Sequence, residues 1–218
     1  MSVFGLTNAD ITFGSGATTI NGDVGLGPHT TGSLIKATIN GKLFKDPTST
    51  ASISAKDLTV TGGVVIKDLT GAVNDALAAS AFWAGLAPTQ TFGDITTSTT
   101  ITGSGGLNVI AVNSINMVGG TLTLAGTPTS IFIFNVAGDF ILNGTQMVLS
   151  VSGGVDFGRV LWNFPTAGTD IKIFKPVGSA FGTFLAPIRG VLLDKAQLTG
   201  AIISSGSILV HSGALICP

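Results

Sequence analysis

The feature that most constrains the fold is a short repeat near the C-terminus. Gly182-Thr-Phe-Leu-Ala186 recurs as Gly200-Ala-Ile-Ile-Ser204, and Val191-Leu-Leu193 recurs at nearly the same offset as Ile208-Leu-Val210. Self-similarity at a fixed short period is the signature of stacked repeat architectures. Each unit has room for three short strands and three corners, which predicts one triangular coil of a parallel β-helix.

The repeat extends in both directions with small adjustments. Gln197-Leu198 is predicted to match Ala214-Leu215, and Leu161-Trp-Asn163 is predicted to precede its counterpart Leu185-Ala186 by a longer interval. The longer unit requires extra residues, which we expect to bulge at a corner around Lys175 to Ala180. Elsewhere, short apolar runs alternate with Gly, Asn, Asp or Ser, as in an all-β fold. The fold class predicted is an all-β solenoid, a right-handed parallel β-helix of triangular cross-section.

One segment has helical instead of strand periodicity. Apolar or small residues fall at i, i+3, i+4 and i+7 between Asp68 and Ala84, the spacing of an amphipathic helix. Asp68 is predicted to cap its N-terminus and Gly85 to end it, with Pro88 blocking continuation. A single long α-helix at about 68–84 is therefore expected to pack alongside the β-helix, and residues 1–218 are expected to form one domain.

Composition excludes several classes of function. The formal net charge is -1 with 10% charged residues, so there is no basic footprint for nucleic acid. No apolar run approaches the roughly 20 residues of a membrane span. Cys217, the single cysteine, cannot form an internal disulfide or a cysteine-based zinc site. We expect an extracellular, secreted or cell-surface location, although the sequence starts without a signal peptide.

Catalytic and metal-binding patterns are not apparent. His29 and His211 are the two histidines, and neither belongs to a ligand pair. Gly14-Ser-Gly16 and Gly103-Ser-Gly-Gly106 are interpreted as turns, because no nucleophile elbow or phosphate loop surrounds them. The aspartates are scattered singly. We therefore expect no enzyme activity, no metal and no cofactor; Asn143-Gly-Thr145 is an acceptor for N-glycosylation in a secreting eukaryote.

Several segments carry a family resemblance. The stretch Ala17–Pro28, ATTINGDVGLGP, resembles the N-terminal motif of the ice-binding-protein-like (antifreeze) β-helix family, and Leu69–Ala76 resembles the start of that family's long helix. The middle and last coils are similar as well, at Ile133–Gly138, Val160–Trp162 and Gly200–Ile203. The resemblance implies a non-catalytic protein that binds ice through a flat face of the β-helix.

A sister group offers a second function. Leu161-Trp-Asn-Phe-Pro165 and Phe184-Leu-Ala-Pro187 are closer to the related adhesive (choice-of-anchor A) domains. This similarity implies an adhesive, structural or self-assembling surface module that contacts a protein, a glycan or another copy of itself. Because fold alone does not choose between functions, both hypotheses stay open. A third class, an enzyme on a pectate-lyase-like β-helix, would need clustered Asp, Arg or Lys at a cleft.

The resemblance also implies a position for the binding face. In the family it includes the strand after the "I-L-A" strand, which here corresponds to segments 139–143, 170–173, 189–194 and 207–211. Alternation along these strands predicts a face edged by Asp139, Asp170, Arg189 and Asp194. The predicted ice- or partner-binding residues are Ile141, Asn143, Lys172, Leu192, Ser207, Leu209 and His211. Such a face departs from a Thr-rich ice-binding surface, and exposed aliphatic residues in line suit a contact patch.

Threonine is abundant elsewhere, which leaves an alternative face. If Asp94–Thr102 is extended, Thr96, Ser98, Thr100 and Thr102 lie on one side, and Thr121 and Thr123 alternate with leucines. Further threonines occur in N-terminal strands at Thr18, Thr38, Thr59 and Thr61. Threonine also favours exposed strands through its β propensity, so an ordinary solvated surface is an equal alternative.

Overall fold

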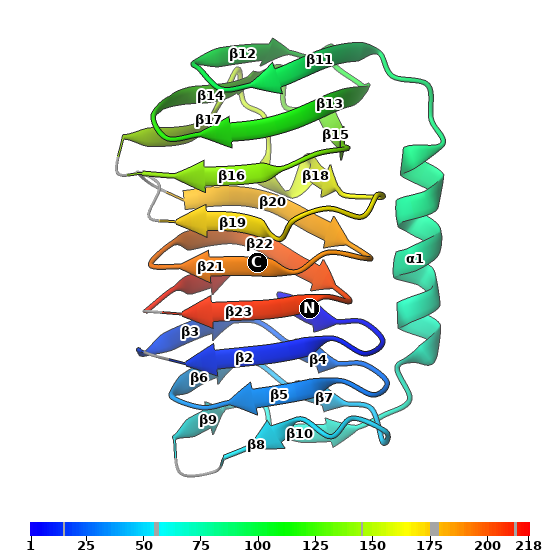
Figure 1. Cartoon of the computed structure of the whole chain (residues 1–218), viewed down its shortest axis with the longest axis vertical. Coiled ribbons are helices and arrows are strands. Elements are labelled where there is room, and N and C mark those ends of the chain that lie inside the picture. Colours follow the sequence, from blue (N-terminus) through cyan, green and yellow to red (C-terminus); the bar gives the residue numbers. More distant parts are fainter. Residues whose placement is uncertain (15, 55–56, 145, 175–178, 212) are drawn as a thin grey trace.

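The computed structural model describes residues 1–14, 16–54, 57–144, 146–174, 179–211 and 213–218. Its strands stack in parallel as a solenoid with three columns, one per side of a triangular coil, and one helix stands beside the stack (Figure 1). The predicted β-solenoid with a single flanking helix is therefore confirmed. The expected bulge at 175–180 lies largely outside the described residues, as do Ser15 and Thr145.

The helix-side column lies beneath the helix. From one end of the stack to the other it contains β11 (Gln90–Ile95), β13 (Leu107–Met117), β15 (Ile131–Val136), β18 (Val160–Asn163), β20 (Ser179–Ala186), β22 (Gln197–Ser204), β1 (Val3–Gly5), β4 (Val24–Leu26), β7 (Leu43–Lys45) and β10 (Val64–Ile66). The longer strands bend around a corner and also belong to a neighbouring column.

The other two columns leave their outer surfaces uncovered by the helix. The front column of Figure 1 contains the C-terminal ends of β11 and β13, then β16 (Phe140–Asn143), β19 (Ile171–Phe174), β21 (Val191–Asp194), β23 (Ser207–His211), β2 (Asp10–Gly14), β5 (Thr31–Leu34) and β8 (Ser52–Ile53). The back column contains β12 (Thr99–Thr102), β14 (Gly120–Ala125), β17 (Met147–Ser152), the first halves of β20 and β22, β24 (Leu215–Cys217), β3 (Thr18–Asn21), β6 (Ala37–Asn40) and β9 (Leu58–Val60).

The order of coils in space differs from their order in the chain. The chain starts in the middle of the stack, winds to one end at β10, crosses through the helix to the other end, and winds back (Figure 1). The last coil then pairs with the first: β22 with β1, β23 with β2 and β24 with β3. The two ends of the chain therefore meet in the middle of the stack.

The register confirms part of the predicted repeat and corrects the rest. Gly182 pairs with Gly200 and Val191 with Ile208, as expected. However, Gln197 pairs with Leu215 instead of Ala214, so the last repeat was misplaced by one residue. Leu161 pairs with Thr183 instead of Leu185, so the counterpart of this strand lies closer in sequence than expected. The discrepancies arise because corner length varies from coil to coil.

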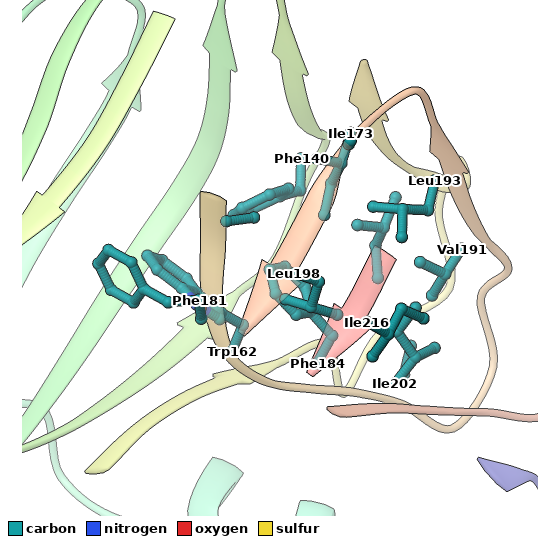
Figure 2. Close-up of a cluster of buried hydrophobic side chains, with 14 of the residues drawn as sticks. Phe140, Trp162, Ile173, Phe181, Phe184, Val191, Leu193, Leu198, Ile202 and Ile216 are labelled. Atoms are coloured by element: carbon teal, nitrogen blue, oxygen red, sulfur yellow. The ribbon is translucent and has the colours of Figure 1, made fainter. Parts of the chain in front are cut away.

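The core fills the inside of the triangle. Inward residues such as Phe140, Ile173 and Leu193 are fully buried, and Figure 2 shows one cluster of them. Along each strand they alternate with outward neighbours. Trp162 stacks on Phe134 with a centroid distance of 4.2 Å, and its indole N–H donates a hydrogen bond of 2.8 Å to the carbonyl of Phe181. Such aromatic pairs add roughly 0.5–1.5 kcal/mol each beyond the burial of their area. Trp162 is thus a core residue.

The helix α1 (Thr70–Ala84) docks through two different contacts. At its start, Leu69 and Val73 pack against Phe4 and Leu6. Further along, buried polar groups join α1 to the sheet, as described next. The predicted helix therefore exists, but its N-cap is Leu69 and not Asp68. The Asp68 carboxylate instead accepts a 2.8 Å hydrogen bond from the N–H of Thr70.

Asn163 anchors the middle of the helix. Its Oδ1 accepts a 2.6 Å hydrogen bond from Ser80 Oγ, and its Nδ2 donates to the Ser80 carbonyl and to Asn135 Oδ1. Asn135 in turn donates to the carbonyl of Trp83 at 2.8 Å, so Trp83 takes part in helix docking. Asn163 and Ser80 are buried, so these bonds satisfy groups that water does not reach.

A second buried group fixes the start of the helix. Asp46 is 3% exposed, and its carboxylate accepts hydrogen bonds from the N–H of Leu69 at 3.0 Å and from the N–H and Oγ1 of Thr48. Burial raises the pKa of Asp46, but these hydrogen bonds outweigh burial and hold the pKa below its ordinary value. A carboxylate at a helix N-terminus is also favoured by the helix dipole.

Asn163→Ala tests the polar anchor. The substitution leaves the Ser80 hydroxyl and carbonyl without their buried partner, which costs about 1–3 kcal/mol in the free energy of unfolding. Asn143→Ala, at an exposed strand end, is the matched control and changes stability by less than about 0.5 kcal/mol. Denaturant unfolding of the three proteins measures the difference. An equal loss of unfolding free energy in the two variants would show that Asn163 does not anchor the helix.

Asp46→Asn tests the helix start through its pH dependence. A carboxyl whose folded pKa is depressed stabilises the fold fully above its unfolded pKa of about 3.9, and this contribution disappears as pH falls through the lower folded value. The wild type therefore loses more stability than the variant as pH falls from about 5 into strong acid. Unfolding free energies across this range make the comparison, with Asp75→Asn on exposed α1 surface as the control. Parallel pH curves for wild type and Asp46→Asn contradict the assignment.

Candidate functional site

The front face, defined as the outward positions of the front column, contains the residues expected from the family resemblance. Ile141 pairs with Lys172, Lys172 with Leu192, and Leu192 with Leu209, so the four side chains form one row across successive coils. Their inward neighbours are buried, which confirms the predicted alternation. The complete row reads Asn116, Ile141, Lys172, Leu192, Leu209, Thr12, Ser33 and Ser52.

The remaining predicted residues of this face lie at its edges. Ser207 begins β23 and pairs with Asp10, while Asn143 ends β16 and pairs with Phe174. His211 pairs with Asp194 on the preceding coil. The structure therefore gathers all seven predicted residues on one surface; their role in binding stays a prediction.

Charge is concentrated along the front face. Asp139 and Asp170 stand just before β16 and β19, and Asp139 accepts a 2.6 Å hydrogen bond from Thr169. Asp94 accepts hydrogen bonds from Ser114 and Asn113, which lower the pKa of its carboxyl. With Lys172 in the central row, this face holds its own hydration water strongly.

Arg189 was expected at the edge of this face, but it is buried. Its guanidinium lies inside a corner and donates to the carbonyls of Thr166, Gly138 and Ala137. Burial lowers the pKa of Arg189, and the charge of Asp139 opposes that effect. The arginine thus ties corners of neighbouring coils together and belongs to the fold instead of the surface.

The back face, defined as the outward positions of the back column, has a different composition. At one end, Thr100, Thr123 and Ser150 lie in register on β12, β14 and β17, and Thr123 Oγ1 lies 2.9 Å from Ser150 Oγ. The leucines beside Thr121 and Thr123 are buried, as predicted. This hydroxyl grid consists of Thr100, Thr102, Thr121, Thr123, Ala125, Val148, Ser150 and Ser152.

Thr96 and Ser98, two residues of the predicted Thr-rich face, lie outside the strands that hold the other four. The chain turns between β11 and β12, so Asp94–Thr102 is not one extended strand, and Thr96 and Ser98 lie at a corner. Ser98 nevertheless touches the grid, because its Oγ accepts a 3.1 Å hydrogen bond from the N–H of Thr121.

A second group of hydroxyl side chains, the threonine ladder, occupies the other end of the back face. Thr19, Thr38 and Thr59 stand in register on β3, β6 and β9. Beside them, Asn40 Nδ2 donates a 2.8 Å hydrogen bond to Asn21 Oδ1. Of the threonines expected in these strands, Thr18 points inward and is buried, so Thr19 takes its place in the ladder.

Sequence reasoning missed this ladder, although a signal was present. The segments Thr18-Thr-Ile-Asn-Gly22 and Ala37-Thr-Ile-Asn-Gly41 are near-copies one coil apart, and Leu58-Thr-Val-Thr-Gly62 follows the same pattern. Between the ladder and the grid, the described outward positions hold Ser179, Phe181, Gln197, Thr199, Leu215 and Cys217. Phe157, in a short 3-10 helix at Phe157–Arg159, stacks on Phe181 and covers it. No strand residue of the back column carries a charge in the part of the chain that the structure describes. Lys36 and Asp57 stand just before β6 and β9, beside the ladder.

The described residues offer little for catalysis. No group of three His, Cys, Asp or Glu side chains able to hold a metal ion is found among them. In the same part of the chain, no helix has the length and apolarity needed to cross a membrane. His29 lies at an exposed corner and His211 on the front face, so the two histidines are not placed as a ligand pair on one strand.

Comparison with known proteins identifies the family. The sequence matches the model of the "Putative Ice-binding-like adhesive domain" over residues 3–212, so the chain belongs to this family. No curated protein matches the sequence.

Solved structures of similar fold share little sequence with this chain. An ice-binding protein from the Antarctic ascomycete Antarctomyces psychrotrophicus has a TM-score of 0.65 at 18% identity, with 97% of this chain and 91% of that chain covered. An ice-binding protein from an Antarctic biological consortium has a TM-score of 0.66 at 19% identity, covering 99% and 86%. An ice-binding protein from an Arctic yeast has a TM-score of 0.61 at 17% identity, covering 97% and 91%. At these identities the likeness shows the fold.

Proposed function

We propose that this domain, residues 1–218, is a non-catalytic extracellular or cell-surface protein that binds ice through its back face. The observation that carries the proposal is the absence of charged residues from the described strands of that face, together with in-register hydroxyl and methyl groups at both ends. The ice-binding proteins of the same fold support it.

The physical reason is the way each group holds water. An ammonium or carboxylate keeps a strong hydration shell that does not fit an ice lattice, whereas threonine presents a methyl and a hydroxyl group on a stiff χ1. Parallel coils repeat these groups at the strand spacing of about 4.8 Å. The grid and the ladder thus offer ordered positions for a layer of ice-like water.

The face inferred from the family resemblance is less suitable for ice. Lys172 lies in the middle of the front face, with Asp139, Asp170 and Asp194 around it. The front face instead favours a second function, adhesion or assembly, because Ile141, Leu192 and Leu209 form an aligned contact row.

Thr123→Lys tests ice binding at the back face. A lysine in the centre of the hydroxyl grid brings its own hydration shell, so the variant is expected to lose most of the thermal hysteresis and of the inhibition of ice recrystallisation shown by the wild type. Thr12→Lys is the matched control, since Thr12 is likewise an outward strand residue but lies on the front face. It keeps the wild-type activity.

The outcome of this pair of variants separates the two faces. Loss of activity in Thr12→Lys with retention in Thr123→Lys would move ice binding to the front face. A wild-type protein without hysteresis and without inhibition of recrystallisation would reject ice binding altogether. Denaturant unfolding of both variants confirms that a lost activity is not a lost fold.

A further inference from the structure

We propose that the front face recognises a second copy of this chain, with the two copies related by a two-fold axis parallel to the strands and midway between β19 and β21. The inference rests on the second function proposed above, a contact role for this face, and is independent of ice binding at the back face. A second copy of the chain is the partner whose charges complement those of the front face.

The centre of the face has the composition of a contact surface. Ile141, Leu192 and Leu209 project from adjacent coils, and the aliphatic stem of Lys172 completes the row between Ile141 and Leu192. Protein interfaces combine an apolar centre with a polar rim. Here the rim consists of Asp139 and Asp170 on one side of the row and Asn143, Phe174, Asp194 and His211 on the other.

Among two-fold axes parallel to the strands, the aspartates and the aliphatic row together select one arrangement. An axis parallel to the strands places each strand opposite the strand at the same distance on the other side of the axis. With the axis midway between β19 and β21, Asp170 faces Gly190 of the second copy and Asp139 faces Ser207. On the next coils, Asp10 faces Ser114. No carboxylate is opposite another carboxylate in this arrangement of the described residues. An axis on β23 or midway between β23 and β2 also separates the carboxylates, but it sets Leu192 opposite Thr12 or Ser33.

Neighbouring positions of the axis produce repulsion. An axis on β21 brings Asp194 onto itself, and an axis on β19 does the same to Asp170 and Lys172. Midway between β21 and β23, Asp170 faces Asp10, and midway between β16 and β19, Asp139 faces Asp170. Facing like charges suppress a wrong register more strongly than a rim pair stabilises the right one.

The selected arrangement also creates an attraction. Lys172 on β19 faces Leu192 of the second copy, and Asp194 of that copy lies two residues further along the same strand. For sheets about 10 Å apart and a rise of about 3.3 Å per residue, the two Cα atoms are roughly 12 Å apart, within reach of a lysine and an aspartate side chain. The two-fold axis generates this pair twice.

Asp194 has an unused acceptor for such a pair. Among the described residues, its Oδ1 is the one buried side-chain nitrogen or oxygen without a hydrogen-bond partner. A buried acceptor without a partner is costly, and an incoming ammonium group relieves the cost. Because this oxygen is covered within its own chain, the Asp194 carboxylate has to rotate before Oδ1 can accept from Lys172 of the second copy.

The experiment uses two charge reversals and their mixture. Lys172→Asp places Asp opposite Asp in both pairs of the dimer, and Asp194→Lys places Lys opposite Lys. Each variant alone is expected to weaken self-association at least about tenfold. In an equimolar mixture, each heterodimer pairs the aspartate introduced by Lys172→Asp with the lysine introduced by Asp194→Lys, and the native Asp194 of the first variant with the native Lys172 of the second.

 

Both pairs of that heterodimer join an aspartate to a lysine, so mixing restores association to near the wild-type level. Sedimentation velocity from about 1 µM to about 1 mM measures the dissociation constants.

Controls separate this inference from ice binding and from misfolding. Thr123→Lys on the back face leaves self-association unchanged, and all variants keep the wild-type unfolding midpoint within a small range. A wild-type protein that stays monomeric throughout the concentration range overturns the inference, and so does a mixture that associates no better than its components. Neither result bears on thermal hysteresis, which the back-face variants measure.

Discussion

Parallel backbone pairing between successive coils is the interaction on which the rest of this structure depends. It is most consequential where the chain closes on itself, since β22, β23 and β24 pair with β1, β2 and β3 across the middle of the stack. Without this junction the solenoid would be two shorter stacks, each with an additional set of open strand edges. The helix bridges the junction, because α1 contacts Phe4 and Leu6 on one side and Asn163 on the other. The front face is continuous only because the two halves are in register, whereas the back column holds two separately paired sets of strands, with β12, β14 and β17 forming a sheet of their own.

Much of this fold follows from local patterns in the sequence. A strand period of two makes Phe140 inward and Ile141 outward without any knowledge of the neighbouring coils. The spacing of Gly182 and Gly200 predicts stacking, because a corner that needs a glycine in one coil needs it again in the next. The helix at Thr70–Ala84 is recognisable because its periodicity contrasts with that of the strands. These features depend on interactions between residues that are close in sequence.

Other features depend on how coils are placed in space, and local patterns do not reveal them. The pairing of Leu215 with Thr19 joins residues from opposite ends of the chain, and no repeat length indicates it. A match of Gln197 with Ala214 would place Ala214 in the outward row. The actual pairing of Gln197 with Leu215 places Leu215 there instead, because a shift of one residue moves every side chain of a strand to the other side. The burial of Arg189 could not be predicted from its own segment, because the carbonyls that accept from its guanidinium belong to corners of other coils. The ladder at Thr19, Thr38 and Thr59 was within reach, since its three segments repeat in sequence.

The two exposed faces can differ in function because each coil contributes separate side chains to each of them. The coil that places Lys172 on the front face places no charge on the back face in its described residues. A two-fold axis parallel to the front strands would bury the charged faces and leave both back faces exposed. In a triangular solenoid, however, each back face slopes away from the front face, so the two back faces are inclined to each other. They cannot both lie flat on one ice plane, and simultaneous engagement is the condition for avidity. Self-association would therefore double the number of ice-binding faces per particle without tightening attachment to a single flat crystal surface.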